Sequence, residues 1–111
     1  MSSSDDEIGE FRHRLTLEAP VRTADEGGTA VVTWTAVAEV WAAIRPTSGR
    51  ERVDADRLTG HVTHEIRIRW RAGVDATQRF RLGPRIFAIN AARDLDERRR
   101  LLVCACEEVG P

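Results

Sequence analysis

Apolar and polar residues alternate along much of the chain with the period of two that is typical of β-strands. The alternation begins at Phe11, where FRHRLTLE places His13 and two leucines on the same face as the phenylalanine. It is clearest in VTHEIRIRW over residues 62–70, and RFRL over residues 79–82 repeats it. Each stretch predicts a half-buried strand. The turn-forming AGVDATQ between the last two predicts that they pair as one hairpin.

A second long strand is expected over residues 29–44, because valine, threonine and tryptophan are frequent there. Pro20 is predicted to end the strand before it, and TADEGG over residues 23–28 supplies the turn. The alanine-rich part AVAEVWAAI also fits a short helix. Its later apolar residues alternate, however, so we expect a strand with a bend near residues 36–38.

RIFAINAARD over residues 85–94 and RRLLVCACEEV over residues 99–109 carry apolar residues on both faces, as central or doubly covered strands do. The chain is therefore predicted to be all-β, a small antiparallel barrel or sandwich of about six strands. Residues 11–111 form the single predicted domain. Residues 1–10 are acidic and poor in apolar side chains, which predicts a disordered tail.

The segment between Pro46 and Gly60 interrupts this regular pattern, because it is charged and has almost no apolar periodicity. Ser48 followed by Glu51 has the spacing of a capping box, which favours a short helical turn. Long loops in small domains are usually functional or disordered. This segment is therefore a candidate functional loop.

Charge and composition restrict the classes of function. The chain has 111 residues, 17 basic and 18 acidic, for a formal net charge of −1, and every basic residue is arginine. Such a balance argues against nucleic-acid binding by bulk charge alone. No apolar run approaches the roughly 18 residues of a membrane span, and the polar N-terminus is unlike a secretory signal. We expect a protein that stays where it is synthesised and has no membrane partner.

The residues offer no convincing catalytic, cofactor or metal site. His13 and His64 each lie on the apolar face of a predicted strand, where a hydrogen-bonded structural histidine is favoured over a catalytic one. Cys104 and Cys106 lie on one face of a strand and are expected to be small, buried, reduced side chains. The histidines have no finger-like spacing with these cysteines. We therefore do not predict an enzyme.

One chemical feature is the arginine stripe on the polar face of the predicted hairpin. Guanidinium groups there suit phosphate contacts. Salt bridges to acids of a neighbouring strand or subunit explain them as well, and this second interpretation is favoured. Three tryptophans, Trp34, Trp41 and Trp70, are expected to be core or interface anchors. The members of the arginine stripe are Arg67, Arg69, Arg71, Arg79 and Arg81.

The order of segments resembles the family of tailed-phage head–tail joining proteins, also called head-closure or stopper proteins, which occur in prophages and gene transfer agents too. The resemblance rests on VWAAIRPTSGRE, THEIRIRWRAGV and IFAINAARDLDERRRLL in this order, and it covers residues 11 to about 108. It implies a β-barrel that assembles in the bacterial cytoplasm into a virion or virion-like particle. No active site is needed for such a role.

The resemblance further implies a ring of six or twelve copies between a portal or adaptor protein above and a tail terminator or tail tube protein below. Double-stranded DNA would pass through this ring without sequence-specific contacts, and the arginine stripe would touch either its backbone or an adjacent subunit. A loop that closes the channel would correspond to the charged segment, with Thr47, Ser48, Gly49, Arg50, Glu51, Arg52, Asp54, Asp56 and Arg57 as its residues.

Two other functions stay open at this point. A stand-alone β-barrel that binds nucleic acid would show micromolar binding with a steep dependence on salt. A small enzyme or metal protein would need bound metal or a cleft that holds His13 or His64.

Overall fold

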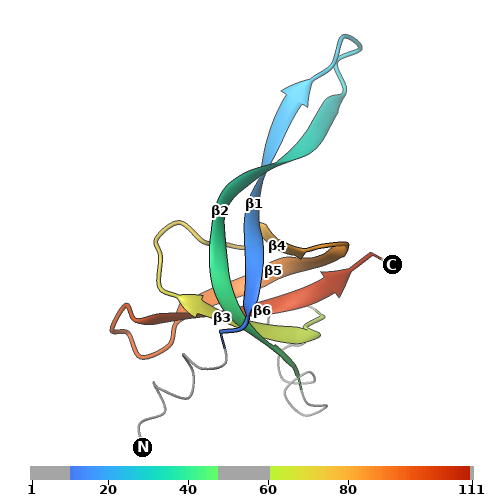
Figure 1. Cartoon of the computed structure of the whole chain (residues 1–111). Coiled ribbons are helices and arrows are strands. Elements are labelled where there is room, and N and C mark those ends of the chain that lie inside the picture. The colour runs from blue at the N-terminus through green and yellow to red at the C-terminus, as the bar shows by residue number, and fades with distance from the viewer. Residues whose placement is uncertain (1–10, 48–60, 111) are drawn as a thin grey trace, which may run out of the picture.

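The computed structural model describes residues 11–47 and 61–110, which form an all-β fold (Figure 1). The prediction of six antiparallel strands is confirmed, and the sheet closes on itself as a barrel, not a sandwich. The strands are β1 (His13–Ala24), β2 (Ala30–Pro46), β3 (His64–Arg69), β4 (Arg79–Leu82), β5 (Arg85–Asp94) and β6 (Leu101–Val109).

The barrel closes where the short strand β4 pairs with β1, in the order β1-β2-β3-β6-β5-β4. Leu17 lies opposite Phe80 at this junction, and both side chains are fully buried. The alternating residues of all strands point inward and fill the centre, as in other small barrels. The buried core consists of Leu15, Leu17, Ala42, Ile66, Ile68, Phe80, Phe87, Ile89, Leu102, Cys104 and Cys106.

The predicted hairpin between residues 62–70 and 79–82 is wrong. Strand β3 pairs with β2 and β6, whereas β4 pairs with β1 and β5, so the two strands lie on different sides of the barrel. The connection between them joins two strands that are not neighbours. Alternation determines which face of a strand is buried but does not determine its partner. The arginine stripe is therefore divided between two separate strands.

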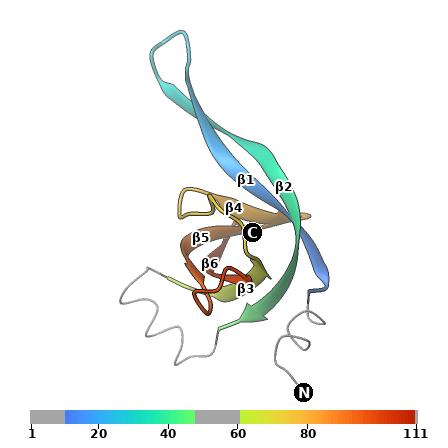
Figure 2. The same ribbon diagram turned by 90° about the vertical axis from the view of Figure 1, so that its left-hand side faces the viewer.

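The outer halves of β1 and β2 extend beyond the barrel as a two-stranded ribbon (Figures 1 and 2). The prediction that Pro20 ends the first strand is wrong, because β1 continues to Ala24 and Pro20 lies opposite Trp34. The pairing of β1 with β4 ends at Glu18, so the edge of β1 that faces away from β2 is not paired with any described strand beyond this residue. A proline, which lacks a backbone N–H, is tolerated on such an edge.

The expected bend near residues 36–38 is confirmed as an irregularity in the β1–β2 register. Leu17 pairs with Ala38 and Glu18 pairs with Ala36, which leaves Val37 as an extra residue. A bulge of this kind bends the strand and increases its twist. It lies where the ribbon leaves the barrel and directs the ribbon away from the core (Figure 2).

The predicted acidic tail and almost all of the candidate loop lie outside the described residues, as does the capping box. Thr47 is the only residue of that loop that the structure places. The described part of the chain contains no helix that is long and apolar enough to cross a membrane.

Candidate assembly surface

The ribbon beyond the barrel, residues 19–37, is hereafter called the outer ribbon, and it exposes large apolar side chains. Val21 and Val31 belong to one face, whereas Trp34 and Val32 belong to the other, as the register of the two strands requires. Their exposed fractions range from 37% for Trp34 to 44% for Val32. Apolar side chains that gather on a protruding element make it a candidate surface for contact with another molecule.

Glu18 holds the base of the outer ribbon to the barrel. It is the only charged residue among the described ones that is buried, with 5% exposure. Its carboxylate accepts a hydrogen bond from Nε of Arg79 at 2.7 Å, and Nε of Arg81 lies 3.3 Å away. The guanidinium of Arg79 also stacks on the Trp34 ring, 4.0 Å from its centroid. These contacts fix the direction in which the ribbon leaves the barrel.

A further ion pair joins β5 to β6. Arg85 donates to both carboxylate oxygens of Glu108, from Nε at 2.8 Å and from Nη2 at 3.1 Å. The hydrogen bond from Arg85 lowers the pKa of Glu108, and it raises the pKa of Arg85 in return. Such a bidentate pair has a defined geometry and supports the strand pairing.

The members of the arginine stripe have different surroundings. Arg79 and Arg81 both contact Glu18, and Arg67 donates to Glu65 from Nε at 3.1 Å. Arg69 and Arg71 form no recorded ion pair with any described residue. Three arginines of the stripe thus form ion pairs within the sheet, as expected for a salt-bridged face. The other two can contact a partner molecule.

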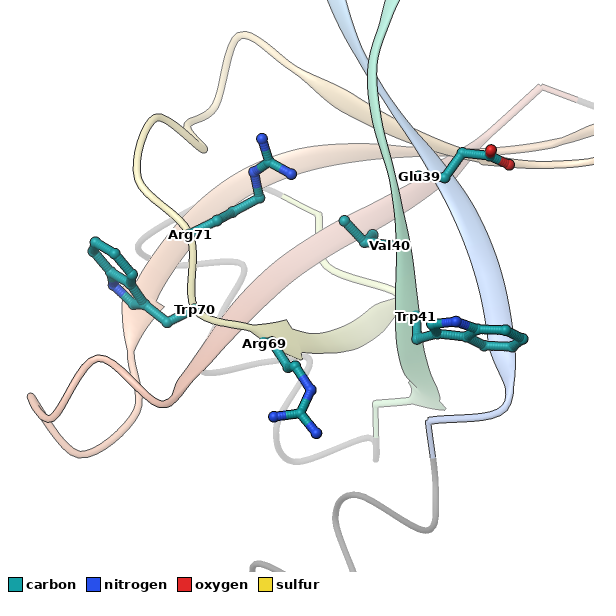
Figure 3. A pocket seen from close by; sticks show the side chains of 6 residues that line it. All are labelled: Glu39, Val40, Trp41, Arg69, Trp70 and Arg71. Atoms are coloured by element: carbon teal, nitrogen blue, oxygen red, sulfur yellow. The ribbon is translucent and has the colours of Figure 1, made fainter.

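These two arginines line a hollow at the point where β2 and β3 separate (Figure 3). The two strands pair up to Ala42 and Ile68 and then diverge. The resulting hollow, which we call the fork hollow, has a volume of about 260 Å³. Nε of Arg71 is buried without a hydrogen-bond partner. The fork hollow is lined by Glu39, Val40, Trp41, Arg69, Trp70 and Arg71.

Two of the three tryptophans are exposed, and the third packs against the core. Trp41 is 55% exposed at the edge of the fork hollow, and Trp34 is exposed on the outer ribbon. Trp70 is half-buried, packs against the core and has the guanidinium of Arg99 over its ring. Of the two predicted roles, interface anchor therefore fits Trp34 and Trp41, and core packing fits Trp70.

The histidines and cysteines do not form a reactive cluster. As predicted, His13 lies on the same face as Leu15, opposite the buried Ala42, but its side chain is exposed at the start of β1. His64 is partly buried, its Nδ1 lies 2.9 Å from the Thr63 hydroxyl, and its ring meets Phe87 edge-on. Both cysteines are free and buried, as predicted. Burial raises the pKa of Cys104 to about 12 and that of Cys106 well above its usual range.

The sequence pattern did not predict that the outer ribbon protrudes and exposes apolar side chains. The run VVTWTAV was interpreted only as a strand, although consecutive apolar residues on both faces of a strand require either two covered faces or a partner. The protruding ribbon and the arginine-lined fork hollow indicate a small β-barrel suited to protein–protein assembly. Within residues 11–47 and 61–110, no group of His, Cys, Asp or Glu could hold a metal ion.

Comparisons with known proteins agree with this class. The profile of the phage head completion protein family matches residues 7–109. A solution structure of protein SF1141 from Shigella flexneri 2a is similar, with a TM-score of 0.72, 29% identity, and coverage of 91% of this chain and 95% of that one. A chain from the virion of a native gene transfer agent particle has a TM-score of 0.65, 36% identity, and coverage of 88% and 94%. No curated protein matches significantly.

The chain belongs to the phage head completion protein family. The resemblance inferred from the sequence segments is thereby confirmed. The protein is a structural head–tail connector component of a virion or virion-like particle.

Proposed function

We propose that copies of this chain form a closed ring between the portal or adaptor protein and the tail, where the ring retains packaged DNA and receives the tail. The observation that carries the proposal is the outer ribbon, which exposes apolar side chains on both faces and is suited to contact with a partner. Identical subunits that contact one another through two different surfaces form either a ring or a filament. A ring suits a junction through which DNA passes.

The candidate loop is proposed as the part of the ring that closes the DNA channel. The described residues on its two sides are hydrogen-bonded to each other. Thr47 donates its backbone N–H to the carbonyl of Thr63 at 3.0 Å and its hydroxyl to the carbonyl of Val62 at 3.3 Å. Whatever its conformation, a segment with such fixed ends can change without disturbing the strands. This arrangement supports a role separate from that of the barrel.

The ring is proposed to act by its shape and contacts, without catalysing a reaction. Membership of a family of structural virion proteins supports this proposal. Passing DNA would meet the ring through its phosphate backbone, without sequence readout. A near-zero net charge suits this task because strong general affinity for DNA would hinder its movement.

Removal of the gene from the parent phage or particle-producing strain tests the proposal. We expect heads and tails that are made but stay separate, with little DNA retained in the heads. Expression of the chain from a plasmid should restore joined particles. Joined, DNA-filled particles in the absence of the protein would contradict the proposed function.

A further inference from the structure

The far end of the outer ribbon presents a carboxylate that has no partner in the described part of the molecule. Glu26 is exposed and lies in the turn that joins β1 to β2. The turn has a defined shape, because the carbonyl of Asp25 accepts from the N–H of Gly28 at 3.0 Å and its Oδ1 accepts from the N–H of Thr29 at 2.8 Å. Gly28 has a φ of 82°, a conformation that favours glycine. The tip is thus an ordered acidic end.

The fork hollow has the complementary charge, because its two arginines outnumber Glu39, whose carboxylate is paired with Arg14. It contains Arg69 and Arg71, neither of which is recorded in an ion pair with the described residues. A buried N–H donor without an acceptor is uncommon in native proteins and calls for an explanation. Nε of Arg71 is such a donor. This nitrogen is itself enclosed, so a carboxylate of another molecule would contact the remaining guanidinium nitrogens of Arg69 and Arg71, which it fits well.

The apolar parts of the two surfaces also match. The exposed valines of the outer ribbon adjoin its acidic tip, and Val40 and the exposed Trp41 share the lining of the fork hollow with the two arginines. In both surfaces a charged group therefore has an apolar neighbour. Contacts of this composition, with an aromatic residue and arginine, are typical of protein interfaces.

A chain cannot place its own tip in its own fork hollow. The hollow begins at Glu39 on β2, and the tip precedes Ala30 on the same strand. Nine residues of extended strand separate these positions, which corresponds to roughly 30 Å. The outer ribbon also points away from the barrel (Figures 1 and 2). The occupant must therefore come from another molecule.

We propose that the acidic tip of the outer ribbon, with Glu26 as its charged group, docks into the arginine-lined fork hollow of a second copy of this chain. The contact is heterologous, because each copy supplies a tip to one neighbour and a hollow to the other. Such a contact closes into a ring when a whole number of identical rotations between neighbouring copies makes one full turn. The inference rests on the proposed ring and adds to it the two surfaces that join the subunits.

Charge reversal tests the contact. The variants E26R, R71E and the double variant E26R/R71E are compared in the assembly that the wild-type chain forms, alone or with its adaptor, by native mass spectrometry and electron microscopy. We expect each single reversal to raise the concentration needed for half-assembly at least about tenfold, and the double variant to recover most of this loss. R98E is the matched control, because Arg98 is exposed on a turn without a recorded ion pair to described residues.

A second pair, R69E with E26R, guards against misfolding of R71E, since the Arg69 side chain is the more exposed of the two arginines. Tryptophan fluorescence and a thermal melt confirm folding of each variant.

Two results would overturn the contact while the ring itself stands. One is unchanged assembly of the single variants E26R and R71E, and the other is a loss of assembly that neither double variant repairs. A wild-type chain that forms no ring even at the head–tail junction overturns the proposed function instead. Weaker binding of duplex DNA by R71E, with assembly unaffected by E26R, would assign the fork hollow to phosphate and also overturn the contact.

Discussion

Glu18 and Arg79 form a 2.7 Å ion pair at the junction where β1 and β4 close the barrel. The carboxylate is buried at the residue where the β1–β2 register shifts and the outer ribbon begins. A buried carboxylate needs charged partners to offset the loss of hydration, and Arg79 and Arg81 supply them. One interaction therefore supports both the closed barrel and the orientation of the outer ribbon.

Replacement of Glu18 by glutamine is expected to lower the free energy of unfolding by about 1–3 kcal/mol, because two arginines then lose their counter-charge. Urea unfolding followed by tryptophan fluorescence measures this loss. E39Q is the matched control, since Glu39 forms an exposed ion pair with Arg14, worth less than about 1 kcal/mol. Equal stability of E18Q and wild type would show that the pair is not needed for closure.

The pair of Arg85 and Glu108 makes the stability of the fold depend on pH. Since the pKa of Glu108 is lowered in the folded state, its contribution is present above the usual glutamate pKa of 4.5 and is lost as the pH falls through the lower folded value. The effect is expected to stay below about 1 kcal/mol, because Arg85 is 41% exposed and solvent screens the pair. Unfolding of wild type and E108Q at pH 7 and pH 3 should show a difference at pH 7 that shrinks at pH 3. A constant difference would contradict the assignment.

The two thiols should not react in the folded protein. Burial raises the pKa of Cys104 to about 12, so only roughly one thiol in ten thousand is ionised at pH 8. We expect iodoacetamide to label neither cysteine of the native chain and both cysteines in urea, as measured by mass spectrometry. Rapid labelling of the native chain would show that β6 opens or that the thiols are exposed.

Deletion of residues 48–58 is expected to leave the barrel folded and to impair the particle. The hydrogen bonds of Thr47 with Val62 and Thr63 lie outside the deleted segment and hold its ends. The variant should keep the thermal stability of the wild type within a few degrees and should still join a ring. Particles that contain it are expected to lose DNA, as nuclease treatment and quantitative PCR would show. Full retention of DNA and normal transfer by such particles would remove the channel-closing role from this segment.

Alternation in the sequence predicted most of the barrel wall. Leu15 and Leu17 are buried as their spacing required, and Cys104 and Cys106 lie together in the core. These predictions succeed because the side-chain period of a strand is a local property. The partner of a strand is not local. The sequence neighbours β3 and β4 were expected to pair, but closure of the sheet places β3 beside β6 and β4 beside β1.

The assembly surface was harder to predict for the same reason. Arg67 and Arg69 alternate on one strand face, yet Arg67 contacts Glu65 and Arg69 lines the fork hollow. Their difference depends on where β2 and β3 separate, which no spacing in the sequence reveals. Trp34 and Val37 are also indistinguishable from core residues by type. Their exposure follows from the bulge that directs the outer ribbon away from the barrel.

A reconstruction of the head–tail junction by electron cryomicroscopy, from particles that contain this chain, tests the central claim most directly. We expect a closed ring of identical barrels between the portal side and the tail, with every outer ribbon in contact with a neighbouring molecule. A chain found outside this junction, or present there as isolated copies with uncovered outer ribbons, would contradict the account.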